Sequence, residues 1–326
     1  MKKSLKIISI CLVVLFSVLF STVMIYYFGA VYPSFTKIAT KEFEIPGLDT
    51  KFVPQGITFD SSNKQFLISG YMSDNSPSRI YVVNTQNDNC KYVTLKQESQ
   101  DYKLHAGGIA VYENYVFVSG DKTLVRFKLE DLISCNNSDA INIVDKLETG
   151  NGCDFLEIYN NQLIVGEFYK KDKYETNTNH HIKTSTDKTN YALAYIYDLN
   201  AFNTYGLNSE IPVKALSLPN QVQGMTFTKN GNIFLSTSYS IPASKLYTFK
   251  NVLNEETTLT VSIKNNNIPL YILDDNNLLS TIKAPAMSEE AVKVEDKIYL
   301  LFESNCKKYR MVNRTRLSYV YSLDIQ

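Results

Sequence analysis

Five polar side chains stand at or beside one position of a pattern that recurs along the sequence. They are Gln55, His105, Asp154, Gln223 and Glu289. Four of them align with Gly107, and His105, two residues before that glycine, can fill the space beside it. Polar side chains that converge on one axis away from water cost free energy unless they are paired, hydrated or bind something. The sequence therefore predicts a polar site made of two amides, an imidazole and two carboxylates.

Two further carboxylates interrupt strands that are otherwise apolar. Glu167 and Glu303 each end a run of large apolar residues, where a charged side chain is unusual. Both are expected to face the mouth of the site or a partner. Glu290 is the alternative to Glu289 at the axis if the alignment of the repeats is displaced by one residue.

Three kinds of chemistry are compatible with these residue types. Asp154 and Glu289 could hold Ca²⁺, a hard cation that prefers oxygen ligands. The amides of Gln55 and Gln223 would then supply further oxygen atoms. Alternatively, Asp154, Glu289 and His105 could act as acid and base, as paired carboxylates do on a glycoside. The third reading is recognition without catalysis.

No sequence motif of a known catalytic site accompanies these residues. The chain has no serine elbow, zinc spacing, phosphate loop or dinucleotide fingerprint. The leading interpretation is therefore binding of a small molecule, glycan or protein at the mouth of a channel. The alternative is a hydrolase or lyase that uses the same carboxylates, with or without Ca²⁺.

Five copies of one hairpin position these residues. Each copy is a short strand, a polar turn and a second strand that ends in a small or acidic residue. The copies cover residues 53–71, 105–120, 153–168, 222–237 and 288–304. Their starts are about 50, 50, 70 and 65 residues apart, and four strands with their turns take roughly 40–50 residues, which is one propeller blade. The apolar period of two excludes helical repeats, so the sequence predicts an all-β, five-bladed β-propeller.

Three segments fall outside the simple repeat. Residues 257–283 hold more strand-like sequence than one strand needs, so a six-bladed ring is the runner-up. The polar segment 169–190 has no apolar period, and its pair His180-His181 is expected to be exposed to solvent. The last repeat has three strands, and the spare strand 41–45 is expected to close the ring as the outer strand of the last blade.

The N-terminus predicts a membrane anchor. Residues 1–6 are basic, and 7–31 are 25 uncharged, mostly apolar residues, long enough to cross a hydrocarbon core of roughly 30 Å. The lysines before this run place the N-terminus in the cytoplasm and the rest of the chain outside. The expected domains are a stub at 1–6, an anchor at 7–31, a tether at 32–40 and the propeller at 41–326. A cleaved signal peptide is the competing interpretation.

The overall composition narrows the range of partners. The 33 basic residues equal the 33 acidic ones, which argues against nucleic acid, because phosphate binding needs a basic surface. Four cysteines lie outside the apolar run, and they could form two disulfides in any of three pairings or remain as thiols. These are Cys90, Cys135, Cys153 and Cys306.

The hairpin motifs resemble those of a known group of proteins. Pro54-Gln55-Gly56-Ile57, Val222-Gln223-Gly224-Met225 and Leu67-Ile68-Ser69-Gly70-Tyr71 are similar to motifs of exported β-propeller repeat proteins of Gram-positive bacteria, over about residues 40–326. A fainter likeness is to calcium-dependent lactonase propellers, in which Glu-Gly opens the first blade and a metal lies on the axis. That likeness implies a calcium-dependent hydrolase, with Gln55-Gly56 in place of Glu-Gly. Asp154 and Glu289 would then be the charged groups near the metal.

Overall fold

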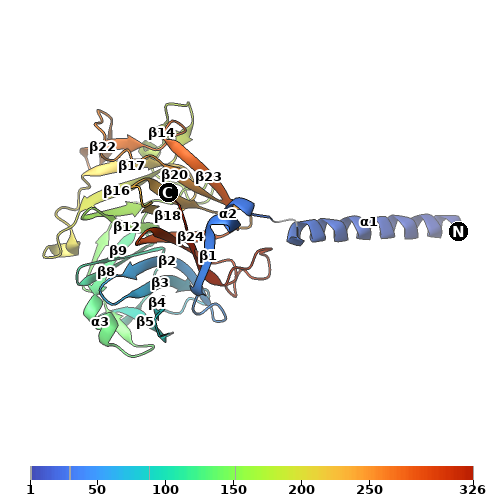
Figure 1. The fold of residues 1–326 in the computed structure, drawn as a ribbon, viewed down its shortest axis with the longest axis horizontal. Coiled ribbons are helices and arrows are strands. Elements are labelled where there is room, and N and C mark those ends of the chain that lie inside the picture. Colours follow the sequence, from blue (N-terminus) through green and yellow to red (C-terminus); the bar gives the residue numbers. More distant parts are fainter. Residues whose placement is uncertain (1, 29–30, 88, 151, 326) are drawn as a thin grey trace.

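The first strands of the five repeated hairpins form the innermost strands of five antiparallel sheets. The computed structural model describes residues 2–28, 31–87, 89–150 and 152–325. Within these ranges the five sheets stand as blades around one axis (Figure 1). Each innermost strand packs against the next, and the last contacts the first. This closed ring confirms the predicted five-bladed β-propeller.

Each blade runs outward from the axis as an antiparallel sheet. Blade 1 contains β2 (Phe52–Asp60), β3 (Gln65–Met72), β4 (Arg79–Asn84) and β5 (Asn89–Gln97). Blade 2 contains β7 (Gly108–Tyr112), β8 (Tyr115–Gly120), β9 (Thr123–Lys128) and β11 (Asp145–Glu148). Blade 3 contains β12 (Phe155–Tyr159), β13 (Gln162–Gly166), β16 (Ala192–Asp198) and β17 (Lys214–Leu218). Blade 4 contains β18 (Val222–Phe227), β19 (Ile233–Thr237), β20 (Ser244–Phe249) and β23 (Leu278–Ala284). Blade 5 contains β24 (Ser288–Val294), β25 (Lys297–Phe302), β26 (Tyr319–Leu323) and β1 (Ala39–Glu44).

The outer strand of blade 5 comes from the other end of the chain. β1 pairs antiparallel with β26, so one sheet holds the first and last strands of the propeller together. The segment before β1 is also folded onto the propeller. In α2 (Pro33–Ile38) the ring of Phe35 packs against Phe302 and Tyr321, with centroids 5.9 and 5.6 Å apart. Residues 32–40, expected to be a tether, therefore form a helix followed by the start of a strand.

Short strands extend two of the blades. β10 (Ala140–Asn142) pairs in parallel with β5 on the edge of blade 1. β21 (Thr260–Ile263) and β22 (Asn266–Ile272) extend blade 3 through the parallel pairing of β22 with β17. Residues 257–283 therefore extend blade 3 and complete blade 4, and the described chain forms no sixth blade from them. The remaining short elements are β6 (Gln100–Tyr102), β14 (Ile182–Lys183), β15 (Thr189–Asn190), α3 (Leu129–Ser134) and the 3₁₀ turns Thr178–His180 and Thr204–Gly206.

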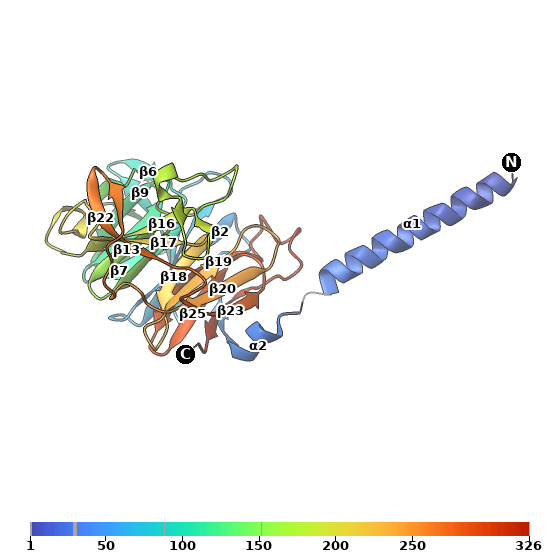
Figure 2. The same cartoon turned by 90° about the horizontal axis from the view of Figure 1, so that it is seen from above.

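The N-terminal helix extends away from the propeller (Figures 1 and 2). It is α1 (Lys2–Phe28), and its part Lys6–Met24 has a mean hydropathy of 2.7 with none of it buried in the protein. Among the described helices it alone is long and apolar enough to cross a membrane. A signal sequence has the same length and composition.

The core lies between adjacent blades. Each blade contributes at least one fully buried phenylalanine: Phe52, Phe117 with Phe127, Phe155, Phe234 and Phe302. Burial of each such side chain stabilises the fold by roughly 1.5–3 kcal/mol. Cys153 and Cys306 are buried thiols in this core, and no disulfide links the described cysteines.

The carboxyl group of one glutamate links several blades at the axis of the ring. Glu290, in β24, is buried. Its two oxygens accept the backbone N–H groups of Ile57, Ile109 and Leu156 at 2.7, 3.2 and 2.9 Å. These donors lie on the innermost strands of blades 1, 2 and 3. Gly56 provides the space for this carboxyl group, because a Cβ at that position would lie 3.0 Å from Oε2 of Glu290. The side chain of Glu290 therefore links blade 5 to three other blades.

Candidate functional site

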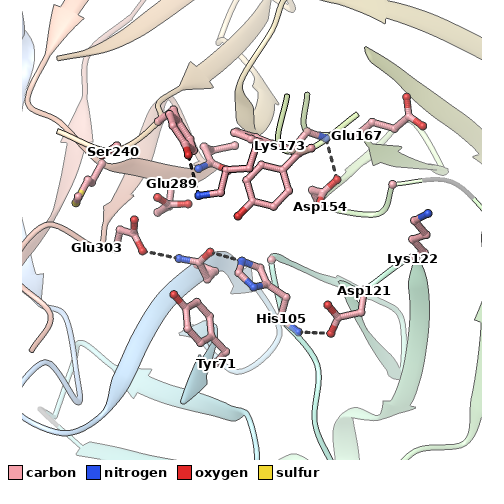
Figure 3. A pocket seen from close by; sticks show the side chains of 18 of the residues that line it. Tyr71, His105, Asp121, Lys122, Asp154, Glu167, Lys173, Ser240, Glu289 and Glu303 are labelled. Atoms are coloured by element: carbon pink, nitrogen blue, oxygen red, sulfur yellow. Dashed lines mark hydrogen bonds between the residues drawn. The ribbon is translucent and has the colours of Figure 1, made fainter. Parts of the chain in front are cut away.

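A cavity of about 780 Å³ opens where the innermost strands begin (Figure 3). All seven residues that the sequence singled out line it: Gln55, His105, Asp154, Glu167, Gln223, Glu289 and Glu303. The repeat thus brought together side chains that are up to 248 residues apart in the chain. The alignment of the repeats expected Glu289 at the axis, but the structure places the alternative, Glu290, there, and Glu289 lines the cavity.

The same backbone irregularity aims three of these residues at the cavity. The register between the first two strands of a blade shifts at Gln55 in blade 1 and at Gln223 in blade 4. In blade 5 it shifts between Ser288 and Ala291, in the stretch that contains Glu289. A β-bulge adds a residue without a partner and redirects its side chain. The repeated hairpin therefore carries a bulge at the mouth in three of the five blades.

Two carboxyl groups meet on one wall of the cavity. Glu289 and Glu303 are within hydrogen-bonding reach of each other, and a hydrogen bond between them requires a proton on one of them, because two carboxylates have no donor. Burial raises the pKa of Glu289 well above its usual range, and burial raises the pKa of Glu303 to about 7. Glu289 is 2% exposed, and one of its carboxyl oxygens has no hydrogen-bond partner. This wall of the cavity therefore holds two neighbouring carboxyl groups that are both harder to ionise than in water.

A chain of hydrogen bonds leads from this pair to the imidazole. Gln55 Nε2 donates to Glu303 Oε2 at 2.9 Å, and Gln55 Oε1 lies 2.8 Å from Nε2 of His105. Burial lowers the pKa of His105, so the ring is neutral and its Nε2–H donates to the amide. The ring also stacks on Tyr71, with centroids 4.7 Å apart. His105 is therefore a donor in this chain, and its Nε2 is not free to accept a proton.

Asp154 lies across the cavity from Glu289 and Glu303 (Figure 3). Its Oδ2 accepts the backbone N–H of Phe168 at 2.8 Å, and burial raises its pKa to about 7. In the part of the chain that the structure describes, no group of three or more His, Cys, Asp and Glu side chains could hold a metal ion. The residues expected to share a calcium ion, Asp154 and Glu289, thus lie on two separate walls.

The segment 169–190 is fixed to blade 3 by a buried histidine. His180 is 2% exposed, and its Nδ1 lies 3.0 Å from Oε2 of Glu167. The hydroxyl of Tyr195 donates to the other oxygen of the same carboxylate at 3.0 Å. The expectation that His180-His181 is exposed is wrong for His180, and His181 is itself half-buried. The carboxylate of Glu167 is committed to holding this segment.

We expect His180→Ala to lower the free energy of unfolding by roughly 2–3 kcal/mol, because it leaves the buried carboxylate of Glu167 short of a partner. It should also speed proteolytic cleavage within residues 170–177. Chemical denaturation and limited proteolysis measure the two effects. His181→Ala is the matched control and should change both much less. Equal effects of the two substitutions would contradict this role for His180.

The rim of the cavity carries lysines that the sequence did not single out, and two of them contact tyrosines. Lys308 Nζ donates to the hydroxyl of Tyr71 at 2.7 Å, and Lys173 Nζ donates to that of Tyr239 at 2.9 Å. Tyr71 lies in β3, and Tyr239 follows the end of β19. The two lysines lie on segments that interrupt the repeat, where the alignment of hairpins gives no signal.

Comparison with known proteins adds three similar structures. No family model and no curated protein match the chain. The PQQ-bound aldose sugar dehydrogenase of Streptomyces coelicolor is 13% identical, with a TM-score of 0.46 over 87% of this chain and 96% of that one. A protein of unknown function from Bacteroides thetaiotaomicron is 12% identical, with a TM-score of 0.41 over 89% and 76%. The extracellular domain of a proposed one-component system of the same species is 13% identical, with a TM-score of 0.35 over 88% of this chain and 40% of that one. The strand pairing of the chain itself identifies it as a β-propeller.

Proposed function

We propose that this chain is a membrane-anchored, extracytoplasmic propeller that binds a small ligand with a positively charged nitrogen in the cavity at its mouth. The observation that carries this proposal is the carboxyl oxygen of Glu289, which is buried, lacks a hydrogen-bond partner and lies beside Glu303. An ammonium group supplies hydrogen-bond donors and a positive charge, and the charge favours the ionised form of both carboxyl groups.

The other residues around the cavity support a cationic ligand. Six carboxyl side chains line it against three lysines. The acids are Asp121, Asp154, Glu167, Glu175, Glu289 and Glu303, and the lysines are Lys122, Lys173 and Lys308. Without Glu167, which contacts His180, five carboxyl groups remain against three lysines, and the carboxyl groups of Asp154 and Glu303 ionise as the pH passes about 7. Five aromatic side chains share the lining: Tyr71, Phe168, Tyr174, Tyr239 and Tyr309. A cation over such a ring gains roughly 0.5–2 kcal/mol.

The N-terminal helix supports the proposed location. α1 is long enough to cross a bilayer, and Lys2, Lys3 and Lys6 precede its apolar part. Because positive charge is retained on the cytoplasmic side, these lysines favour an orientation with the propeller outside. The cavity would then meet ligands outside the cell.

A hydrolase or lyase has less support from the geometry. Asp154 and Glu289 lie on opposite walls (Figure 3), and each is held by a different part of the ring. Glu289 and Glu303 are within hydrogen-bonding reach of each other, which is closer than the roughly 5 Å that separates the two carboxyls of a retaining glycosidase. His105 donates to an amide. The positions of these carboxyl groups and of the imidazole therefore fit ligand binding better than catalysis.

A thermal-shift screen of residues 31–326 tests the proposal. The probes are choline, glucosamine and spermidine, each compared with an uncharged analogue such as glucose for glucosamine. A ligand at a hundredfold excess over its Kd stabilises the folded protein by about 2.7 kcal/mol. We expect a rise in Tm with at least one cationic probe, lost in Glu289→Gln and kept in Glu256→Gln, an exposed carboxylate outside the cavity.

Other outcomes of the screen separate the alternatives. Equal shifts from charged and uncharged analogues would contradict a cationic ligand. A shift with Ca²⁺ that chelation reverses and Asp154→Asn abolishes would instead support the calcium hypothesis. Turnover of a bound probe that stops in Glu289→Gln would support an enzyme over a binding module.

A further inference from the structure

We propose that the loop of residues 305–317 docks onto an anionic membrane surface and holds the mouth of the cavity against the bilayer. The inference rests on the proposed anchoring by α1 but not on the proposed ligand. The loop, called the basic loop below, joins β25 to β26 in blade 5.

The composition of the basic loop fits a lipid surface. Its 13 residues include five cations and no Asp or Glu. The cations are Lys307, Lys308, Arg310, Arg314 and Arg316. At its tip, Met311 and Val312 are 75% and 54% exposed. Cations around an exposed apolar tip are the combination that binds anionic headgroups and inserts between them.

The basic loop lies next to the place where the chain leaves the membrane. Arg314 donates to the hydroxyl of Tyr32 at 3.2 Å, and Tyr32 is buried in the propeller. α1 ends at Phe28, so the path from the end of the helix to Tyr32 is four residues. Four residues span at most about 14 Å. The loop must therefore lie close to the bilayer surface from which α1 emerges. Figures 1 and 2 both show the dark red loops of blade 5 on the side from which α1 departs.

Contacts within the propeller hold the basic loop in this position. Arg310 donates to the carbonyl of Leu48 at 2.7 Å and to the carboxylate of Asp49 at 2.8 Å. These contacts hold the loop in place beside its tip, while Lys307 and Arg316 are exposed. Each cation near an anionic membrane contributes roughly 1 kcal/mol. The anchor adds to this, because it makes docking an intramolecular step at high effective concentration.

Docking of the basic loop would orient the cavity. Lys308, Tyr309 and Val312 belong both to the loop and to the lining of the cavity. With the loop on the membrane, one side of the mouth faces the lipid surface. Ligands at the surface of the bilayer would then reach the cavity over a shorter path than ligands from bulk solution.

Cosedimentation of residues 31–326 with lipid vesicles tests the docking. This fragment lacks α1, whose described side chains from Lys6 to Met24 are fully exposed and contribute nothing to the core, and it keeps Tyr32 and α2. We expect binding to vesicles that contain phosphatidylglycerol, little binding to phosphatidylcholine alone, and weaker binding at high salt. Lys307→Glu combined with Arg316→Glu should weaken binding at least tenfold. Met311→Asp should weaken it separately.

The matched control is Lys64→Glu combined with Lys229→Glu. Both lysines are exposed in turns between the first and second strands of their blades, at the other end of the ring from the cavity. This variant has the same net charge as the loop variant and should bind vesicles as the unchanged fragment does. Equal losses in the two variants, or equal binding to the two kinds of vesicle, would overturn the proposal. Because the fragment lacks α1, its binding to vesicles tests the basic loop whether α1 is an anchor or a cleaved signal peptide. The thermal-shift screen tests the proposed ligand independently of membrane docking.

Discussion

Replacing Glu290 by alanine is expected to lower the free energy of unfolding of the propeller by roughly 3–9 kcal/mol, since three buried backbone N–H groups lose their acceptor and each costs about 1–3 kcal/mol. The three donors lie on separate blades, so the loss loosens the ring at its axis. Burial raises the pKa of Glu290, and the three N–H bonds oppose that rise. Urea denaturation followed by circular dichroism measures the change.

Glu289→Ala is the matched control for this prediction. Glu289 is the adjacent residue, has the same side chain and is equally buried, but one of its oxygens has no partner. Its removal deletes a carboxyl that is costly to bury, so the expected destabilisation is much smaller. Glu290→Gln should lie between the two, because an amide has one acceptor oxygen and an N–H₂ group that would face donors. A loss below about 1 kcal/mol for Glu290→Ala would contradict its role at the axis.

The position of the site followed from the repeat because each blade begins in the same way. Gln55, Gln223 and Glu289 were aligned from sequence, and all three lie in bulges at one end of the ring. A repeated hairpin must place equivalent residues at equivalent distances from the axis. The sequence could not decide which of Glu289 and Glu290 faces the axis. The bulge in blade 5 adds one residue to the strand, and a shift of one residue exchanges the faces of neighbouring side chains.

Features outside the repeat could not be predicted because nothing in the sequence is aligned with them. His180 lies in a polar segment without periodicity, and only its contact with Glu167 reveals that it is buried. The edge strand β10 pairs with β5 of blade 1, although in the chain it lies between two strands of blade 2. Strand-like sequence at the edge of a blade can pair with either neighbour, and the local pattern does not distinguish them.

The stability of the empty protein is expected to fall as the pH rises from about 4 to about 7. Burial raises the pKa of Glu303 to about 7 from 4.5, and that of Asp154 to about 7 from 3.8. Between these values the folded protein binds more protons than the unfolded chain, so stability decreases with pH. The stabilisation from each of these two groups is complete below about pH 4 and is lost as the pH passes 7. It amounts to on the order of 3 kcal/mol in the free energy of unfolding for each group. Thermal melts between pH 5 and pH 8 measure it.

Glu303→Gln combined with Asp154→Asn should flatten this pH dependence, and Glu256→Gln should leave it unchanged. Some slope will remain, because burial also raises the pKa of Glu157, outside the cavity, to about 8. A slope as steep in the double variant as in the unchanged protein would contradict the assignment to the cavity.

The same charges give the proposed ligand the opposite pH dependence. Above pH 7 the carboxyls of the cavity lose their protons, which destabilises the empty protein and strengthens its attraction for an ammonium group. The Tm of the empty protein should therefore fall between pH 5 and pH 8 while the shift produced by a cationic probe grows. An uncharged ligand would gain nothing from this ionisation. A probe shift that stays constant between pH 5 and pH 8 would therefore show that the buried carboxyls do not bind the ligand. That conclusion would hold even if these carboxyls affect stability as strongly as expected.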